Sequence, residues 1–279
     1  MQHTPRMERE TTPAINQLST IVVVILFGYL VLPYLELPPQ EVSFNLFGIE
    51  LLFELQVRSL IALLLAGLAA VGANWLLNMH PYYHGQSLIL HAILPALTAW
   101  IATIPLAQVA FDMRWWGLFF TAAGLLMAVF TAEYISLDPQ DKRYSFATMG
   151  LTALSFGLYL FLAISMRGGA VRLIVSSATL AVVSFPITLR TLYLRTEGKW
   201  HWGWAVGITL VIAQAAIGLH YLPLSPILFA ILMVALAYAL TDASEALIQG
   251  RSLRRVWIET GVIVAIMVVI GVLLGRFLG

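Results

Sequence analysis

The stretch from Asn74 to His91, NWLLNMHPYYHGQSLILH, is a short polar joint between two long apolar runs of the chain. It holds three of the six histidines, with a proline and a glycine that interrupt helical structure. Apolar runs of roughly 17–25 residues are long enough to cross a lipid bilayer as α-helices. The joint is therefore predicted to connect two membrane spans, and the rest of the chain repeats this alternation of apolar run and connector.

The composition supports a membrane protein. The 279 residues are 60% hydrophobic and 10% charged, whereas soluble domains are about 25% charged. Lipid is expected to cover much of such an apolar surface. The net charge of +1 offers no basic patch, so membrane lipids are expected as partners and nucleic acid is not. The absence of cysteine excludes disulfides, thiolate nucleophiles, iron–sulfur clusters and cysteine-ligated zinc.

Nine stretches are long and apolar enough to be membrane spans. Their predicted ranges are 18–35, 57–79, 87–106, 114–136, 146–166, 171–194, 202–221, 224–245 and 255–277. The predicted fold class is thus an all-α transmembrane bundle of about nine spans. A cytoplasmic tail at 1–17 precedes a single polytopic transmembrane domain at 18–279. The first apolar run is too long for a signal peptide and no small-residue cleavage site follows it, so it is expected to remain as a span.

The longest connector, residues 36–56, contains VSFNLFGIELLFEL, in which apolar and polar residues alternate around Phe47 and Gly48. This alternation predicts a short β-hairpin at 42–55 on the membrane surface. The alternative is an interfacial helix that leads into the second span.

The positions of Lys and Arg indicate the orientation, because these residues are enriched in cytoplasmic connectors. With a cytoplasmic N-terminus, ten of the fifteen lie inside and five outside. An odd number of spans then places the C-terminus outside. The protein is expected to be a multi-pass protein of the cell inner membrane.

Small residues recur at four-residue spacing in two spans. Gly203 and Gly207 lie in the seventh span, and Gly271, Gly275 and Gly279 continue this spacing along the last span. Such spacing allows helices to approach closely. It is typical of packing within one bundle, and in the last span it also suits contact with a second copy or with a partner in a membrane complex.

Ionisable side chains inside a span are costly and are often functional. With the orientation above, polar residues gather in one layer at the cytoplasmic ends of the spans. This candidate polar pocket consists of Asn74, His84, His91, Glu133, Arg190, Asp242 and Glu259. Two interpretations are open: the residues lie singly among lipid headgroups, or they converge on a pocket open to the cytoplasm. Pro95 and Pro186 favour the pocket, because each frees a backbone carbonyl within a span.

The histidine spacing raises the question of a metal. His80 and His84 are four residues apart, a spacing that can chelate a metal on a helix, with His91 as a further ligand. Pro81 and Gly85 argue against a continuous helix there, so neither a metal site nor a cofactor is predicted. Motifs of zinc peptidases, serine hydrolases, P-loop proteins and dinucleotide-binding proteins are absent from the sequence.

Four short segments carry a resemblance to a known family. They are NMHP at 78–81, AEY at 132–134, QAAIGLHYLP at 214–223 and IET at 258–260. Together they resemble an uncharacterised family of bacterial polytopic membrane proteins, a domain of unknown function, from about residue 42 onward. The resemblance implies a bacterial inner-membrane protein with no assigned activity or cofactor. It transfers no functional residues, although its segments include His80, Glu133 and Glu259.

Three classes of function remain. The first is a membrane-embedded binding or transport protein for a small molecule or lipid, which the intramembrane carboxylates and Arg190 favour. The second is a non-catalytic subunit or scaffold of a membrane complex, which the short connectors suit. The third is an enzyme acting on a lipid-soluble substrate, with histidines and carboxylates of the polar layer as acid, base or metal ligand.

Overall fold

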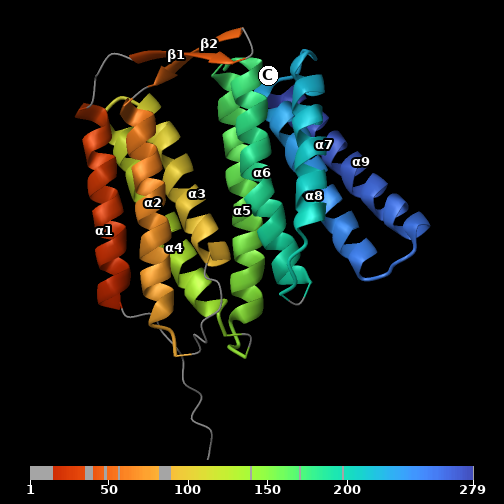
Figure 1. The fold of residues 1–279 in the computed structure, drawn as a ribbon, viewed down its shortest axis with the longest axis horizontal. Coiled ribbons are helices and arrows are strands. Elements are labelled where there is room, and N and C mark those ends of the chain that lie inside the picture. The colour runs from red at the N-terminus through yellow and green to blue at the C-terminus, as the bar shows by residue number, and fades with distance from the viewer. Residues whose placement is uncertain are drawn as a thin grey trace, which may run out of the picture. The chain divides into compact units, whose positions relative to one another are not determined.

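The computed structural model describes residues 15–34, 40–46, 49–55, 57–81, 89–138, 140–169, 171–196 and 198–278. Each of the nine predicted spans coincides with a helix, with ends that agree to within a few residues (Figure 1). The helices are α1 (Ile15–Val31), α2 (Val57–Asn78), α3 (Ile89–Gln108), α4 (Met113–Ile135), α5 (Tyr144–Gly168), α6 (Leu173–Arg195), α7 (Trp202–His220), α8 (Pro226–Ile248) and α9 (Leu253–Leu278). Over the described residues, eight of them, α1 to α8, are long and apolar enough to cross a membrane.

The connector after α1 contains the predicted hairpin. A 3-10 turn (Leu32–Tyr34) ends the first span, and strands β1 (Gln40–Leu46) and β2 (Ile49–Leu55) pair antiparallel. Gln40 lies opposite Leu55, and Leu46 lies opposite Ile49. The alternation in this segment therefore indicated strands correctly, and the alternative of an interfacial helix was wrong.

The chain divides into two compact units, Met1–Leu151 and Thr152–Gly279, and each is described by itself. The prediction of one polytopic domain at 18–279 stays a prediction. In the first unit α1 packs against α2 and α4, and α3 packs against both α2 and α4 (Figure 1). The core between these helices is made almost entirely of Leu, Ile, Ala and aromatic side chains.

Two hydrogen bonds tie the end of α3 to its neighbours. The last carbonyls of a helix have no partner inside it. The buried indole of Trp115 donates to the carbonyl of Leu106 at 3.0 Å, and the guanidinium of Arg58 donates to the carbonyl of Ala107 at 3.2 Å. The first turn of α4 and the start of α2 thus supply donors that lipid cannot offer.

Helix ends also receive local caps. The carboxylate of Asp112 accepts the N–H groups of Arg114 and Trp115 at the start of α4, at 2.8 and 3.3 Å. At the end of α8, Gly250 adopts φ 78°, a left-handed conformation that glycine takes without a steric penalty. These local structures help to define where α4 begins and where α8 ends.

Helices α1 and α2 approach closely at two glycines. A Cβ atom added at Gly72 would lie 2.6 Å from Cγ2 of Ile21, and one added at Gly28 would collide with the side chain of Leu65. Ile21 and Leu65 are both buried. The packing of α1 on α2 therefore depends on the absence of a side chain at Gly28 and at Gly72.

In the second unit α6 packs against α7 and α8, α7 packs against α8, and α8 packs against α9. Arg167, near the end of α5, donates to the carbonyls of His220 and Leu222 at 3.0 and 2.8 Å. Its guanidinium also lies 5.6 Å from the ring centre of Phe229. One cation thus satisfies the carbonyls at the end of α7 and packs on α8.

We predict that Gly72→Ala lowers the free energy of unfolding by about 1–2 kcal/mol, because the added methyl group overpacks the contact with Ile21. Gly67→Ala is the matched control: it lies on the same helix, and an added Cβ meets nothing within 4 Å. This control should leave stability unchanged or raise it by up to about 1 kcal/mol. Denaturant titration of the purified protein in detergent micelles measures both, and equal stability of the two variants would contradict the prediction.

Candidate functional site

Two of the predicted polar residues meet in the first unit. His91 is the third residue of α3 and Glu133 is the third residue from the end of α4. Nδ1 of His91 lies 2.8 Å from Oε2 of Glu133, a short hydrogen bond or ion pair. The Glu133 side chain is 1% exposed and that of His91 13%. The imidazole is therefore the more accessible member of the pair.

The backbone beside this pair is also polar. Pro95 lies in α3 and has no N–H for the carbonyl four residues earlier, which is that of His91. Ser136 follows α4, and its buried hydroxyl donates to the carbonyl of Glu133 at 2.8 Å. The same hydroxyl lies 3.5 Å from Nδ1 of His91. The site thus combines an imidazole, a carboxylate, a hydroxyl and a freed carbonyl.

This geometry differs from that of a serine hydrolase. In such an enzyme the serine contacts one ring nitrogen of the histidine and the carboxylate contacts the other. Here Ser136 and Glu133 both approach Nδ1 of His91, so the hydroxyl is not placed for activation by the second nitrogen. The described contacts therefore do not form the serine–histidine–carboxylate chain of such an enzyme.

A second histidine, His80, lies at the same end of the unit, against the residue that follows Glu133. His80 is 3% exposed, and its ring meets the ring of Tyr134 edge-on at 4.4 Å. Burial lowers the pKa of His80, while the nearby carboxylates of Asp138 and Asp141 oppose that shift. The side-chain hydrogen bond from Arg143 holds the pKa of Asp141 below its usual range. In the folded protein His80 is therefore biased toward its neutral form.

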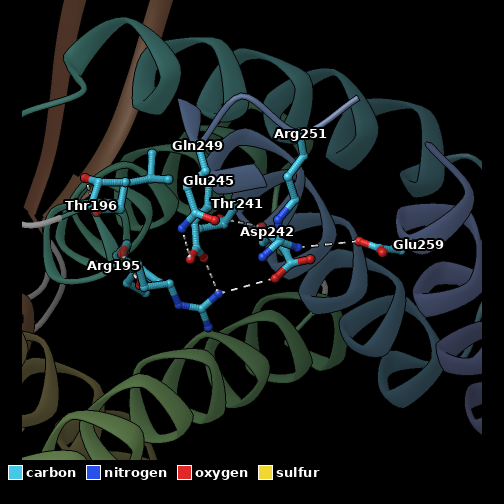
Figure 2. A network of polar contacts seen from close by, with 12 residues as sticks. Arg195, Thr196, Thr241, Asp242, Glu245, Gln249, Arg251 and Glu259 are labelled. Atoms are coloured by element: carbon cyan, nitrogen blue, oxygen red, sulfur yellow. Dashed lines mark hydrogen bonds and ion pairs between the residues drawn. The ribbon is translucent and has the colours of Figure 1, made fainter. Parts of the chain in front are cut away.

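The second unit contains a network between α6 and α8 (Figure 2). The guanidinium of Arg195 lies 3.0 Å from a carboxylate oxygen of Glu245 and 3.5 Å from one of Asp242. It also lies 5.6 Å from the ring centre of Tyr238, and Gln249 donates to Glu245 at 3.0 Å. These side chains are partly exposed, so solvent weakens each pair.

The other two predicted residues of this unit have different surroundings. Arg190 is 2% exposed within α6. Glu259, near the start of α9, accepts from Arg255 at 2.8 Å and lies 3.8 Å from Arg251 (Figure 2). Both arginines are exposed, so this pairing is a surface network.

The remaining predicted residues belong to the joint and its approach. Asn74 lies on the exposed side of α2, next to the exposed indole of Trp75. His84 lies outside the described residues, as does Gly279 of the glycines predicted to contact a second copy or partner. The structure thus joins His91 with Glu133, and the convergence of all seven residues on one pocket stays a prediction.

Among the described residues no group of three or more His, Asp or Glu side chains is placed to hold a metal ion. Of the three metal candidates, His80 packs on Tyr134 and His91 contacts Glu133. The third, His84, lies outside the described part of the chain.

Sequence reasoning missed Arg195, Glu245 and Ser136. The signal for Glu245 was its position three residues after Asp242, which places both carboxylates on one face of a helix. Arg195 lies in the last turn of α6, where a cation opposite two carboxylates is favoured. No pattern in the sequence indicates Ser136, because its contacts depend on how α3 packs against α4.

The fold and the site define the class of the protein: it is a multi-pass α-helical membrane protein with ionisable side chains buried near the ends of its spans. The chain matches, over residues 37–274, the family described as protein of unknown function (DUF5656), and it belongs to that family. The resemblance seen in the sequence is thereby confirmed. Comparisons with curated proteins and with solved structures returned no match.

We predict a strong coupling between His91 and Glu133. His91→Leu leaves the buried carboxylate without its imidazole and should lower the free energy of unfolding by about 3 kcal/mol. The double variant His91→Leu/Glu133→Leu should recover most of this loss, because an apolar pair replaces the polar one. Denaturant titration in micelles tests this, and a double variant with additive losses would count against a direct contact.

We also predict that His80 makes the protein sensitive to mild acid. Its folded pKa lies below the ordinary value of about 6.5, so the unfolded chain binds more protons between these two values. The contribution of neutral His80 to the free energy of unfolding is complete above about pH 6.5, and it is lost as the pH falls below that value. His80→Phe keeps the ring contact with Tyr134 but cannot be protonated. Its free energy of unfolding should fall less than that of the wild type between pH 7.5 and 5.5, and parallel profiles would refute the assignment.

Proposed function

We propose that this protein binds or transports a small molecule or lipid within the membrane, and that the His91–Glu133 pair is its protonatable site. We also propose that the protein lies in the inner membrane and that this site faces the cytoplasm. The observation that carries it is the Glu133 side chain, 1% exposed, with its carboxylate 2.8 Å from His91.

A structural role alone explains this pair poorly. Replacing a buried ion pair by well-packed apolar residues is often neutral or stabilising, so stability gives little reason to keep one. Ionisable residues inside spans more often mark the paths of protons and substrates. The partly exposed His91 and the enclosed Glu133 fit that pattern.

The chemistry of the pair suggests how binding is coupled to protons. With Glu133 ionised and His91 neutral, the pair carries one negative charge, and a proton on the imidazole makes it neutral. Histidine is the side chain suited to this change between pH 5 and 8. A substrate that contacts the pair would therefore bind differently to its two charge states, which is the requirement for coupling.

The alternative of a non-catalytic subunit rests on the second unit. Glu259 pairs with Arg255 and Arg251 at the surface, an arrangement that needs no role beyond stabilising the fold. In that case the His91–Glu133 pair would only join α3 to α4, and its charge state would have no effect beyond stability.

The experiment begins with the full-length protein in lipid nanodiscs, where native mass spectrometry identifies a retained compound. Exchange of that compound is then followed in proteoliposomes with and without an imposed pH gradient. We expect the gradient to accelerate uptake by the wild type and to lose this effect in Glu133→Gln. The control Glu50→Gln, in β2, should behave as the wild type. Equal gradient dependence in Glu133→Gln, or no retained compound in the wild type, would overturn the proposal.

A further inference from the structure

A groove runs beside α4 in the first unit, on a side of the helix away from the buried Glu133. It is shallow and largely open, with a volume of about 560 Å³. One wall is a single stripe of α4: Met127, Ala128, Thr131, Ala132 and Ile135. The facing wall consists of Arg143, Phe146 and Ala147, from the connector and the first turn of α5.

The groove has the dimensions and lining of a site for a lipid chain. From Met127 to Ile135 the helix rises by about 12 Å, close to half of the roughly 30 Å hydrocarbon core of a bilayer. Three alanines, Ala128, Ala132 and Ala147, line the groove together with the exposed side chains of Met127 and Phe146. Only one charged side chain, that of Arg143, lines the described groove, beside the end of the stripe at Ile135.

The segment around this end carries equal numbers of acidic and basic residues, but the two signs differ in exposure. Asp138 is buried and accepts the N–H of Gln140, and the Asp141 side chain is 8% exposed against Arg143. In contrast, Lys142 is exposed and the side chain of Arg143 is 42% exposed. The cationic side chains of this formally neutral segment are therefore more exposed than its carboxylates.

We propose that this groove binds an anionic phospholipid, with one acyl chain along α4 and the phosphate at Arg143 and Lys142. An acyl chain complements the apolar walls, and the phosphate complements the cations at the interfacial end. A protein helix on the same face is the competing occupant, and its binding would appear as a change in oligomeric mass. The site is independent of the His91–Glu133 pair, which faces the core.

The absence of cysteine allows a site-specific test. Met127→Cys at the rim of the groove carries a bimane fluorophore, and Phe120→Cys, exposed near the other end of α4, is the reference for general lipid contact. Doxyl-labelled phosphatidylglycerol and phosphatidylcholine with identical chains are titrated into the full-length protein in micelles. We expect phosphatidylglycerol to quench position 127 at about fivefold lower concentration than phosphatidylcholine, and both lipids to quench position 120 alike.

Two further variants separate the roles of charge and shape. Arg143→Gln should weaken phosphatidylglycerol about fivefold and leave phosphatidylcholine unchanged. The control Arg114→Gln removes an arginine with the same local pairing, to an aspartate two residues earlier, at the other end of α4. Ala128→Phe fills the groove and should weaken both lipids. The proposal fails if Arg143→Gln matches Arg114→Gln, if position 127 shows no lipid preference, or if Ala128→Phe changes only the oligomeric mass.

Discussion

Lipid hydrocarbon offers no hydrogen bonds, and this constraint shapes the protein from its helices to its polar sites. Within a helix the backbone satisfies itself, but the ends of α3 and α7 need donors from elsewhere. Arg58, Trp115 and Arg167 supply them through bonds of 2.8 to 3.2 Å to terminal carbonyls. The same constraint pairs the carboxylate of Glu133 with His91, because a buried charge without a partner costs several kcal/mol, on the order of 3–5.

Packing within the first unit follows a different principle. Between helices that are apolar on all sides, attraction comes from close contact rather than from removal of water. At Gly28 and Gly72 the missing side chains let α1 approach α2, and the buried hydroxyl of Tyr29 donates to the carbonyl of Ala99 at 2.8 Å. Helix α1 is thereby fixed on both α2 and α3. The polar pair joins α3 to α4, so a change in its charge acts on helices that are otherwise firmly packed.

The sequence predicted well which residues lie near the ends of helices, and poorly the direction in which their side chains face. Span length and the positions of polar connectors placed all nine helices, and equal depth suggested the meeting of His91 and Glu133. The direction that a side chain faces around the helix axis can be predicted only when polar and apolar residues occupy different sides of the helix. Helix α2 is apolar on every side, so nothing indicated that Asn74 is exposed. For Ser136 the deciding information lay in tertiary packing. For Glu245 it lay in a three-residue spacing that becomes informative only once Arg195 is known to face it.

The starts of α4 and α5 show how the same local chemistry acquires different roles. Asp112 with Arg114, and Asp141 with Arg143, form the same pair: an arginine whose backbone N–H and Nε both donate to an aspartate two residues earlier. Such short-range pairs contribute little to stability where they are exposed. They differ in what surrounds them, since Arg143 lines a mostly apolar groove along α4 and the side chain of Arg114 is 81% exposed. Selectivity for a lipid would therefore arise from the groove beside the arginine, with the arginine choosing among the headgroups that the groove admits.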